Sequence, residues 1–178
     1  MSHTLRPPFS EKDHYQGDLH APLELVEYGD YQCPYCGRAY PIIKRIQSKL
    51  GKDLRFVFRN FPLTDAHPQA YTAALAAEAA GRQDVYWKMH DLLYENQESM
   101  SGQRFFSELA TTLGLDIAKF EAGLQDLAIA NKVDEDFESG VRSGVNGTPG
   151  FFINGLRYDG DWDEESLIAS LKKTLARS

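Results

Sequence analysis

The sequence lacks long apolar segments and carries no excess of basic residues. No apolar run approaches the roughly 18 residues of a transmembrane helix, so the sequence predicts no stable membrane insertion. Residues 1–20 lack the apolar stretch of a secretory signal, which predicts a cytoplasmic protein if Met1 is the native start. Aspartate and glutamate outnumber lysine and arginine by 26 to 19, for a net charge of −7. This acidic balance argues against nucleic acid as a partner.

Cysteine is also scarce, and both copies fall in one four-residue stretch, Cys33-Pro34-Tyr35-Cys36. A zinc site needs about four ligands, and His67 and His90 are too far apart to form a second pair, so we expect no metal and no other cofactor. A disulfide across so short a loop removes only about 2 kcal/mol of denatured-state entropy, against about 4.7 kcal/mol for a loop of about a hundred residues. The spacing therefore favours a redox-active dithiol, with two inert buried thiols as the remaining alternative.

The residues around this stretch place it where a strand passes into a helix. Residues 23–28 suit a buried strand, and apolar residues recur at helical spacing from Ala39 to Leu50. The cysteine pair is then expected in the first turn of the helix, where unpaired backbone N–H groups and the helix dipole favour the thiolate of Cys33. Pro34 suits the opening helical position. We expect Cys33 to be exposed and reactive, and Cys36 to be buried.

The remainder of the chain predicts an α/β domain that is interrupted by helices. Residues 54–59 alternate as a strand, which completes a βαβ unit with residues 23–50. The segment over about residues 66–144 is predicted to be helical almost throughout and to form an insert between the two halves of the sheet. Asn154-Gly155 then marks a hairpin, and a helix over about 163–175 closes the chain. Residues 1–20 show no clear period and are expected to form an arm outside the domain of residues 21–178.

This pattern resembles the DsbA-like members of the thioredoxin fold. The resemblance rests on the C-x-x-C stretch at the start of the first helix, on the helical insert, and on Gly147-Thr148-Pro149 before the hairpin. It implies that Cys33 is the nucleophile of a protein disulfide oxidoreductase, that Cys36 resolves the mixed disulfide, and that Pro149 is cis and faces the dithiol. The Thr148 backbone would then pair with a protein or peptide substrate. Similar domains that carry Gly-Asp-Tyr-x-Cys-Pro-Tyr-Cys occur fused to NhaA-type sodium/proton antiporters.

The residue between Pro34 and Cys36 separates this chain from one group of relatives. Strongly oxidising periplasmic members of the family have a histidine there and a secretory signal, whereas this sequence has Tyr35 and no such signal. Cys-Pro-Tyr-Cys is also similar to the glutaredoxin motif, so a glutathione-linked reductase is one alternative function. A binding module whose dithiol regulates a partner is another. The sequence does not identify the redox partner or the oligomeric state.

Residues outside the motif provide further candidates. Glu27 lies six residues before Cys33 and matches a buried acidic position of thioredoxin-like proteins, where it would accept the proton of Cys36. The alternative is a half-exposed glutamate paired with Arg55 or Arg59. We expect Tyr35 to be exposed and Phe61 to lie in the core. His67 and His90 are interpreted as ordinary helix-end or surface residues with no catalytic role.

Overall fold

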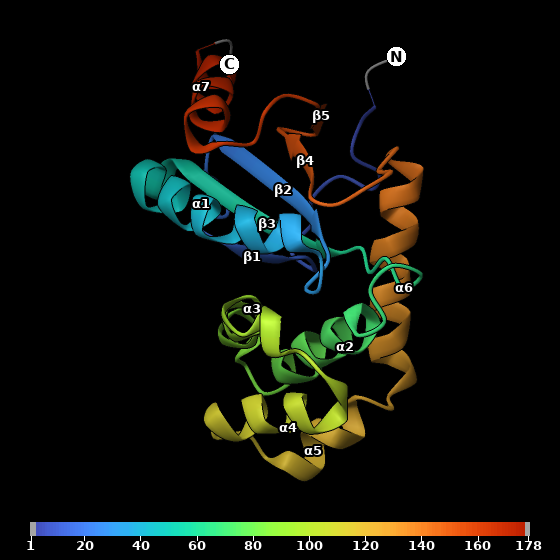
Figure 1. Ribbon diagram of the computed structural model, residues 1–178. Coiled ribbons are helices and arrows are strands. Elements are labelled where there is room, and N and C mark those ends of the chain that lie inside the picture. The colour runs from blue at the N-terminus through green and yellow to red at the C-terminus, as the bar shows by residue number, and fades with distance from the viewer. Residues whose placement is uncertain (1–2, 177–178) are drawn as a thin grey trace. The chain divides into compact units, whose positions relative to one another are not determined.

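The computed structural model describes residues 3–176, and the chain divides into two compact units (Figure 1). The first comprises the described residues up to Gly29, Arg38–Arg59, and the described residues from Glu138 onward. The second comprises Asp30–Gly37 and Asn60–Phe137. The predicted α/β architecture with a helical insertion is confirmed.

A five-stranded sheet forms the core of the first unit. In sequence order its strands are β1 (His14–Gln16), β2 (Leu23–Gly29), β3 (Leu54–Asn60), β4 (Gly150–Ile153) and β5 (Leu156–Tyr158). Their spatial order is β1-β3-β2-β4-β5, and the pairs β1–β3, β2–β4 and β4–β5 are antiparallel. All seven residues of β2 are buried, as expected for the central strand. The hairpin turns at Asn154 and Gly155, both with positive φ, as the Asn-Gly pair predicts.

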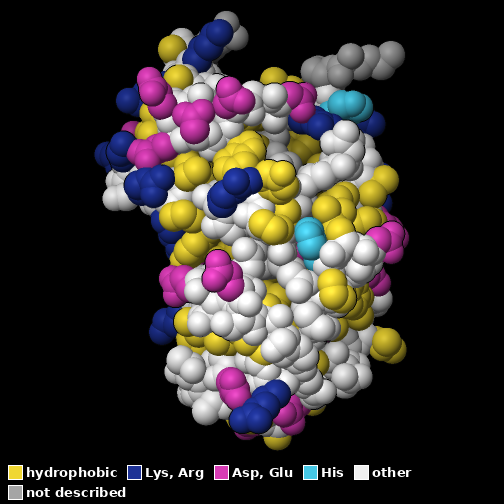
Figure 2. All heavy atoms as spheres, in the orientation of Figure 1, with side chains coloured by type: hydrophobic (Ala, Val, Ile, Leu, Met, Phe, Trp, Pro, Cys, Tyr) yellow, Lys and Arg dark blue, Asp and Glu magenta, His cyan; other side chains and the backbone are white. Residues whose placement is uncertain are grey.

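Two helices of this unit lie side by side. They are α1 (Pro34–Leu50), which belongs to the first unit from Arg38 onward, and α7 (Glu164–Leu175), which contacts β2. Glu164 at the start of α7 forms ion pairs with Arg45 and Lys49 of α1. Figure 2 shows acidic and basic side chains gathered over these two helices. Side chains of opposite charge therefore join the two helices at the surface.

The N-terminal arm is more ordered than the sequence indicates. It contributes β1, which pairs with β3, and Leu5 is buried and donates its N–H to Gly155 O at 2.9 Å. Thr4 forms a bridge with Leu156 of β5. The sequence shows no period here and does not predict this pairing, because the bonding is supplied by strands that come much later in the chain. One short segment of sequence thus forms the strand at one edge of the sheet and pairs with the strand at the other edge.

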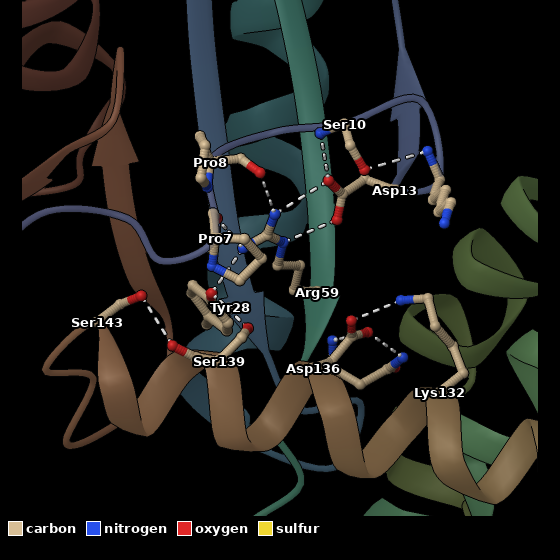
Figure 3. Close-up of polar contacts among 12 residues, drawn as sticks. Pro7, Pro8, Ser10, Asp13, Tyr28, Arg59, Lys132, Asp136, Ser139 and Ser143 are labelled. Atoms are coloured by element: carbon tan, nitrogen blue, oxygen red, sulfur yellow. Dashed lines mark hydrogen bonds and ion pairs between the residues drawn. The ribbon is translucent and has the colours of Figure 1, made fainter.

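The buried side chain of Arg59 in β3 forms hydrogen bonds and an ion pair with residues of this arm (Figure 3). Its Nε and Nη2 donate to the two carboxylate oxygens of Asp13 at 2.8 and 3.0 Å, and its Nη1 donates to Pro7 O at 2.9 Å and to Tyr28 Oη at 3.0 Å. Burial acts to lower the pKa of Arg59, but the hydrogen bonds and charge of Asp13 and Tyr28 outweigh it and raise that pKa. Arg59 is thus a buried, charged side chain that is paired with a buried carboxylate.

The second unit is helical. It contains α2 (Ala70–Gly81), α3 (Tyr86–Glu95), α4 (Gly102–Thr112), α5 (Ile117–Gly123) and the first part of α6 (Leu127–Arg142). The buried face of α2 is rich in alanine, and α2 contacts α3, α4 and α5. Small side chains let neighbouring helices approach this helix closely. The helices occupy the segment in which the sequence predicts an insert.

A buried polar cluster surrounds Asn60, the last residue of β3 and the first of the range Asn60–Phe137 in this unit. Asn60 donates its backbone N–H and its side-chain amide to Asp136, and the same amide donates to Glu78 at 2.9 Å. Lys132 Nζ pairs with the other oxygen of Asp136 at 2.5 Å, as Figure 3 shows. Burial raises the pKa of Asp136, although the charge of Lys132 opposes that shift. The cluster satisfies two carboxylates that are removed from solvent.

Candidate active site

The two cysteines lie at the N-terminus of α1, where the sequence predicts them. The helix begins at Pro34, so Cys33 is the residue immediately before it and Cys36 lies in its first turn. Both are present as thiols, and both are buried: Cys33 is 3% exposed and Cys36 0%. The expectation that Cys33 is exposed is therefore wrong. Helical periodicity fixes where a residue falls along the helix, but it does not reveal what packs over the helix end.

Two features of α1 agree with the sequence. Tyr35 takes the outward position of the motif and is 56% exposed, which confirms its predicted exposure. The helix runs without interruption through Pro41, as the apolar stripe from Ile42 to Leu50 predicts. Pro41 has no N–H to donate to the carbonyl of Gly37, so the helix lacks one backbone bond just after the motif.

The turn before the motif is closed by Asp30, a fully buried residue that the sequence analysis missed. Asp30 Oδ1 accepts hydrogen bonds from the backbone N–H groups of Gln32 at 2.7 Å and Cys33 at 3.1 Å. Asp30 Oδ2 accepts from Leu63 N at 2.9 Å and from His67 Nδ1 at 2.8 Å. An aspartate ahead of a helix that opens with proline is a recognisable turn and cap signal. The sequence therefore contained enough information to predict that Asp30 caps this turn.

The carbonyl side of the same turn is held by Gln97. Its Nε2 donates to Tyr31 O at 2.9 Å and to Cys33 O at 2.8 Å. Gln97 opens a short 3₁₀ helix over Gln97–Ser99, more than sixty residues from the motif. No local pattern predicts this contact, since a lone glutamine in a polar turn carries no structural signal. The helical insert therefore supports the Cys33 residue at its backbone carbonyl.

Gly37 leaves the space that Gln97 occupies, and we predict that Gly37→Ala will destabilise the protein by about 1 kcal/mol. A Cβ at position 37 would lie 2.2 Å from Gln97 Oε1, so the amide must move and both of its donated bonds are lost. That loss, about 1 kcal/mol for each bond, exceeds the gain in helix propensity. Chemical denaturation measures the difference.

The matched control for Gly37 is the same substitution in a Gln97→Ala background. Without the amide there is no steric conflict, so Gly37→Ala should then stabilise the protein through helix propensity alone. The sign of the effect should therefore reverse between the two backgrounds. A Gly37→Ala effect of the same sign in both would contradict the proposed contact.

Aromatic residues of the helical unit surround Tyr31. Its hydroxyl lies 3.0 Å from His90 Nδ1 and 3.2 Å from Tyr86 Oη, and burial is the main cause that raises the pKa of Tyr86. His90 is buried, so its interpretation as a helix-end or surface residue is wrong. It lies among the buried residues of α3, where its ring has the hydroxyl of Tyr31 as a partner.

Phe61 is buried and stacks on Phe137 with ring centroids 4.4 Å apart, which confirms its predicted place in the core.

The remaining candidates belong to the first unit. Glu27 is buried in β2 opposite Phe151 of β4, and the arginines considered as its partners instead pair with other acids, Arg55 with Glu24 and Arg59 with Asp13. Thr148-Pro149 immediately precedes β4, and its peptide bond is cis. Arg6-Pro7 is a second cis bond, which the sequence does not signal. The roles of Glu27, Thr148 and Pro149 toward the dithiol stay predictions.

The described part of the chain has neither a cluster of side chains suited to a metal ion nor a helix suited to crossing a membrane. Residues 3–176 contain no group of three or more His, Cys, Asp or Glu side chains arranged to hold a metal ion. None of the helices in that range has the length and apolar character needed to cross a membrane.

A thioredoxin-like sheet with a dithiol at the head of its first helix defines the class of this protein. The sequence model of the thioredoxin family matches residues 10–173, and the chain belongs to that family. The solved structure of BdbD from Bacillus subtilis shares the fold with a TM-score of 0.85 at 23% identity, covering 99% of this chain and 98% of that one. α-DsbA1 from Wolbachia pipientis superposes with a TM-score of 0.84 at 20% identity, covering 95% and 94%.

The curated relatives are longer proteins. The Na(+)/H(+) antiporter NhaA 1 of Salinispora arenicola is 41% identical over 170 residues, which cover 96% of this chain and 26% of that protein. The Na(+)/H(+) antiporter NhaA of Herminiimonas arsenicoxydans is 37% identical over 169 residues, covering 94% and 27%. The chain thus spans about a quarter of the length of the antiporters that it matches.

Proposed function

We propose that the protein is a thiol-disulfide oxidoreductase that exchanges electrons with protein or peptide disulfides through Cys33 and Cys36. The observation that supports this most directly is the position of the pair. Two thiols flank the first turn of α1, in a fold shared with thioredoxin-like oxidoreductases. The N-terminus of a helix favours a thiolate, and the thiolate is the form that attacks a disulfide.

The proposed exchange proceeds in two steps that balance in atoms and electrons. The Cys33 thiolate attacks one sulfur of the substrate disulfide, forms a mixed disulfide with it, and releases the other sulfur as a thiolate. The Cys36 thiolate then attacks the Cys33 sulfur, which closes a Cys33–Cys36 disulfide and releases the second substrate thiolate. Two electrons have passed to the substrate, and the reverse sequence oxidises a substrate dithiol.

The other predicted site residues take supporting roles in this proposal. Glu27, buried in the central strand, would accept the proton that Cys36 loses before its attack. Thr148 and Pro149 precede β4, and the Thr148 backbone would pair with an extended substrate chain. Pro34 opens the helix, and Tyr35 offers an exposed ring beside the thiols.

Reduction of insulin by dithiothreitol tests the proposal. We expect the purified protein to accelerate insulin precipitation, and to do so without glutathione. An absence of acceleration would overturn the assignment as a disulfide oxidoreductase. A strict requirement for glutathione would move the protein to the glutaredoxin-like alternative, whose Cys-Pro-Tyr-Cys motif it shares.

The antiporter relatives favour a second candidate, a binding module whose dithiol state controls a membrane transporter. The relatives named as antiporters contain a region that matches almost all of this chain. Such a module would need its two cysteines to form and break a disulfide, but it would not need to turn over a generic substrate. Insulin reduction therefore distinguishes the two candidates: an oxidoreductase accelerates it, whereas a regulatory module is expected not to.

A further inference from the structure

The Asp30 carboxylate accepts hydrogen bonds from two separate segments of the chain. Asp30 is 1% exposed, and its two oxygens accept four hydrogen bonds at 2.7–3.1 Å. Two of the donors belong to the turn that leads into Cys33, and the other two, Leu63 N and His67 Nδ1, belong to the segment that follows β3. A carboxylate is only an acceptor, so His67 donates its Nδ1–H in this pair. Asp30 therefore ties the nucleophile's turn to that segment.

This carboxylate is also hydrogen-bonded directly to the backbone of Cys33. It accepts the N–H of Cys33 itself at 3.1 Å, so its negative charge is placed beside the N-terminus of α1. The N–H groups of Gln32 and Cys33 are thus directed at the carboxylate. A nearby charge of like sign disfavours ionisation of a thiol, in opposition to the helix dipole.

We propose that Asp30 is a positioning residue that fixes the Cys33 turn and restrains the Cys33 thiolate by its charge, while His67 moderates that charge. This inference rests on the proposed function, in which Cys33 is the nucleophile. Because the charge of Asp30 disfavours the Cys33 thiolate, the reduced dithiol is less stable than it would be with the helix dipole acting alone. The pair then gives up electrons more readily than one in which the thiolate is strongly stabilised.

Titration of the Cys33 thiolate by its ultraviolet absorbance tests this inference in a Cys36→Ser background. Asp30→Asn keeps an acceptor oxygen for the turn but removes the charge, so the titration midpoint should fall by about one pH unit. With both cysteines present, the same substitution should shift the equilibrium with glutathione toward the reduced protein. The other charged or titratable groups on the neighbouring segments are the same in the two titrated proteins: Glu27, Tyr31, Tyr35, Arg38, Asp65, His67 and Glu98.

Two further variants make the test decisive. Asp65→Asn removes an exposed charge from the segment that carries His67 and should leave the midpoint in place, because solvent screens that charge. His67→Phe keeps the carboxylate but removes one of its donors, so the midpoint should rise. If Asp30→Asn does not fold, the His67 variant decides. A purely structural role for Asp30 would move stability and leave both midpoints unchanged.

The outcomes separate this inference from the proposed function, because the titration requires no substrate. A wild-type protein that does not reduce insulin overturns the oxidoreductase assignment. An unchanged or raised midpoint in folded Asp30→Asn, or an unchanged or lowered one in His67→Phe, overturns the role of Asp30 and leaves that assignment intact.

Discussion

Cys33→Ser should reduce insulin turnover to the rate of dithiothreitol alone. A serine hydroxyl is not ionised near neutral pH and cannot form a mixed disulfide, so the first step of the exchange is lost completely. The substitution exchanges one buried sulfur for an oxygen, and the fold should persist. Far-ultraviolet circular dichroism checks the fold, and the precipitation assay measures the loss. Turnover retained by Cys33→Ser would remove this residue from the role of nucleophile.

Cys36→Ser serves as the matched variant because it leaves Cys33 in place. Attack on the substrate can still occur, but no second thiol remains to release it. This variant should therefore also lose turnover, while it accumulates a covalent adduct that mass spectrometry detects and that Cys33→Ser does not form. Adducts on the Cys33→Ser variant instead would reverse the roles of the two cysteines.

Asp13→Asn should destabilise the protein by about 3–5 kcal/mol, because it leaves the buried Arg59 guanidinium without its carboxylate. Both side chains are almost fully buried, so water cannot replace the lost partner. The guanidinium would keep its bonds to the carbonyl groups of Pro7 and Pro8, which carry no compensating charge. Urea denaturation gives the free energy of unfolding.

Two comparisons establish that the cost arises from an unpaired buried charge. Removing both charges, with Arg59→Met and Asp13→Leu, should restore much of the stability that Asp13→Asn loses. Glu138→Gln breaks the exposed pair with Arg142 in the same unit and should change stability by less than about 0.5 kcal/mol. Similar costs for Asp13→Asn and Glu138→Gln would contradict the dominant role of burial.

The sequence predicts those parts of the fold that depend on local pattern. The strand over residues 23–28, the helix after the motif, the Asn154-Gly155 turn and the closing helix each follow from periodicity or turn chemistry, and each is present. The helical insert is predicted in the same way. These elements place the two cysteines correctly, because a motif at a strand-to-helix junction needs only its neighbours in sequence to be located.

The contacts that the sequence does not predict join residues far apart in the chain. β1 is only three residues long, and its pairing with β3 depends on chain geometry that no period reveals. Gln97 reaches Cys33 O from a polar turn, and His90 finds its hydroxyl partners among buried aromatic residues. The burial of Cys33 is a property of the same kind. Periodicity describes one element at a time, whereas these features depend on which elements come together.

The N-terminal arm supplies β1 at one edge of the sheet and pairs with β5 at the other, and this has a consequence for folding during synthesis on the ribosome. The arm precedes the rest of this domain in the chain, yet Leu5 bonds to Gly155 and Arg6 bonds to Ser143, whose synthesis comes much later. Until then the arm has no partner at the β5 edge, and the side of β2 that later pairs with β4 stays open to pairing with another chain. Closure of the sheet therefore has to wait for the synthesis of β4 and β5, and shortening the arm should increase aggregation of the nascent chain.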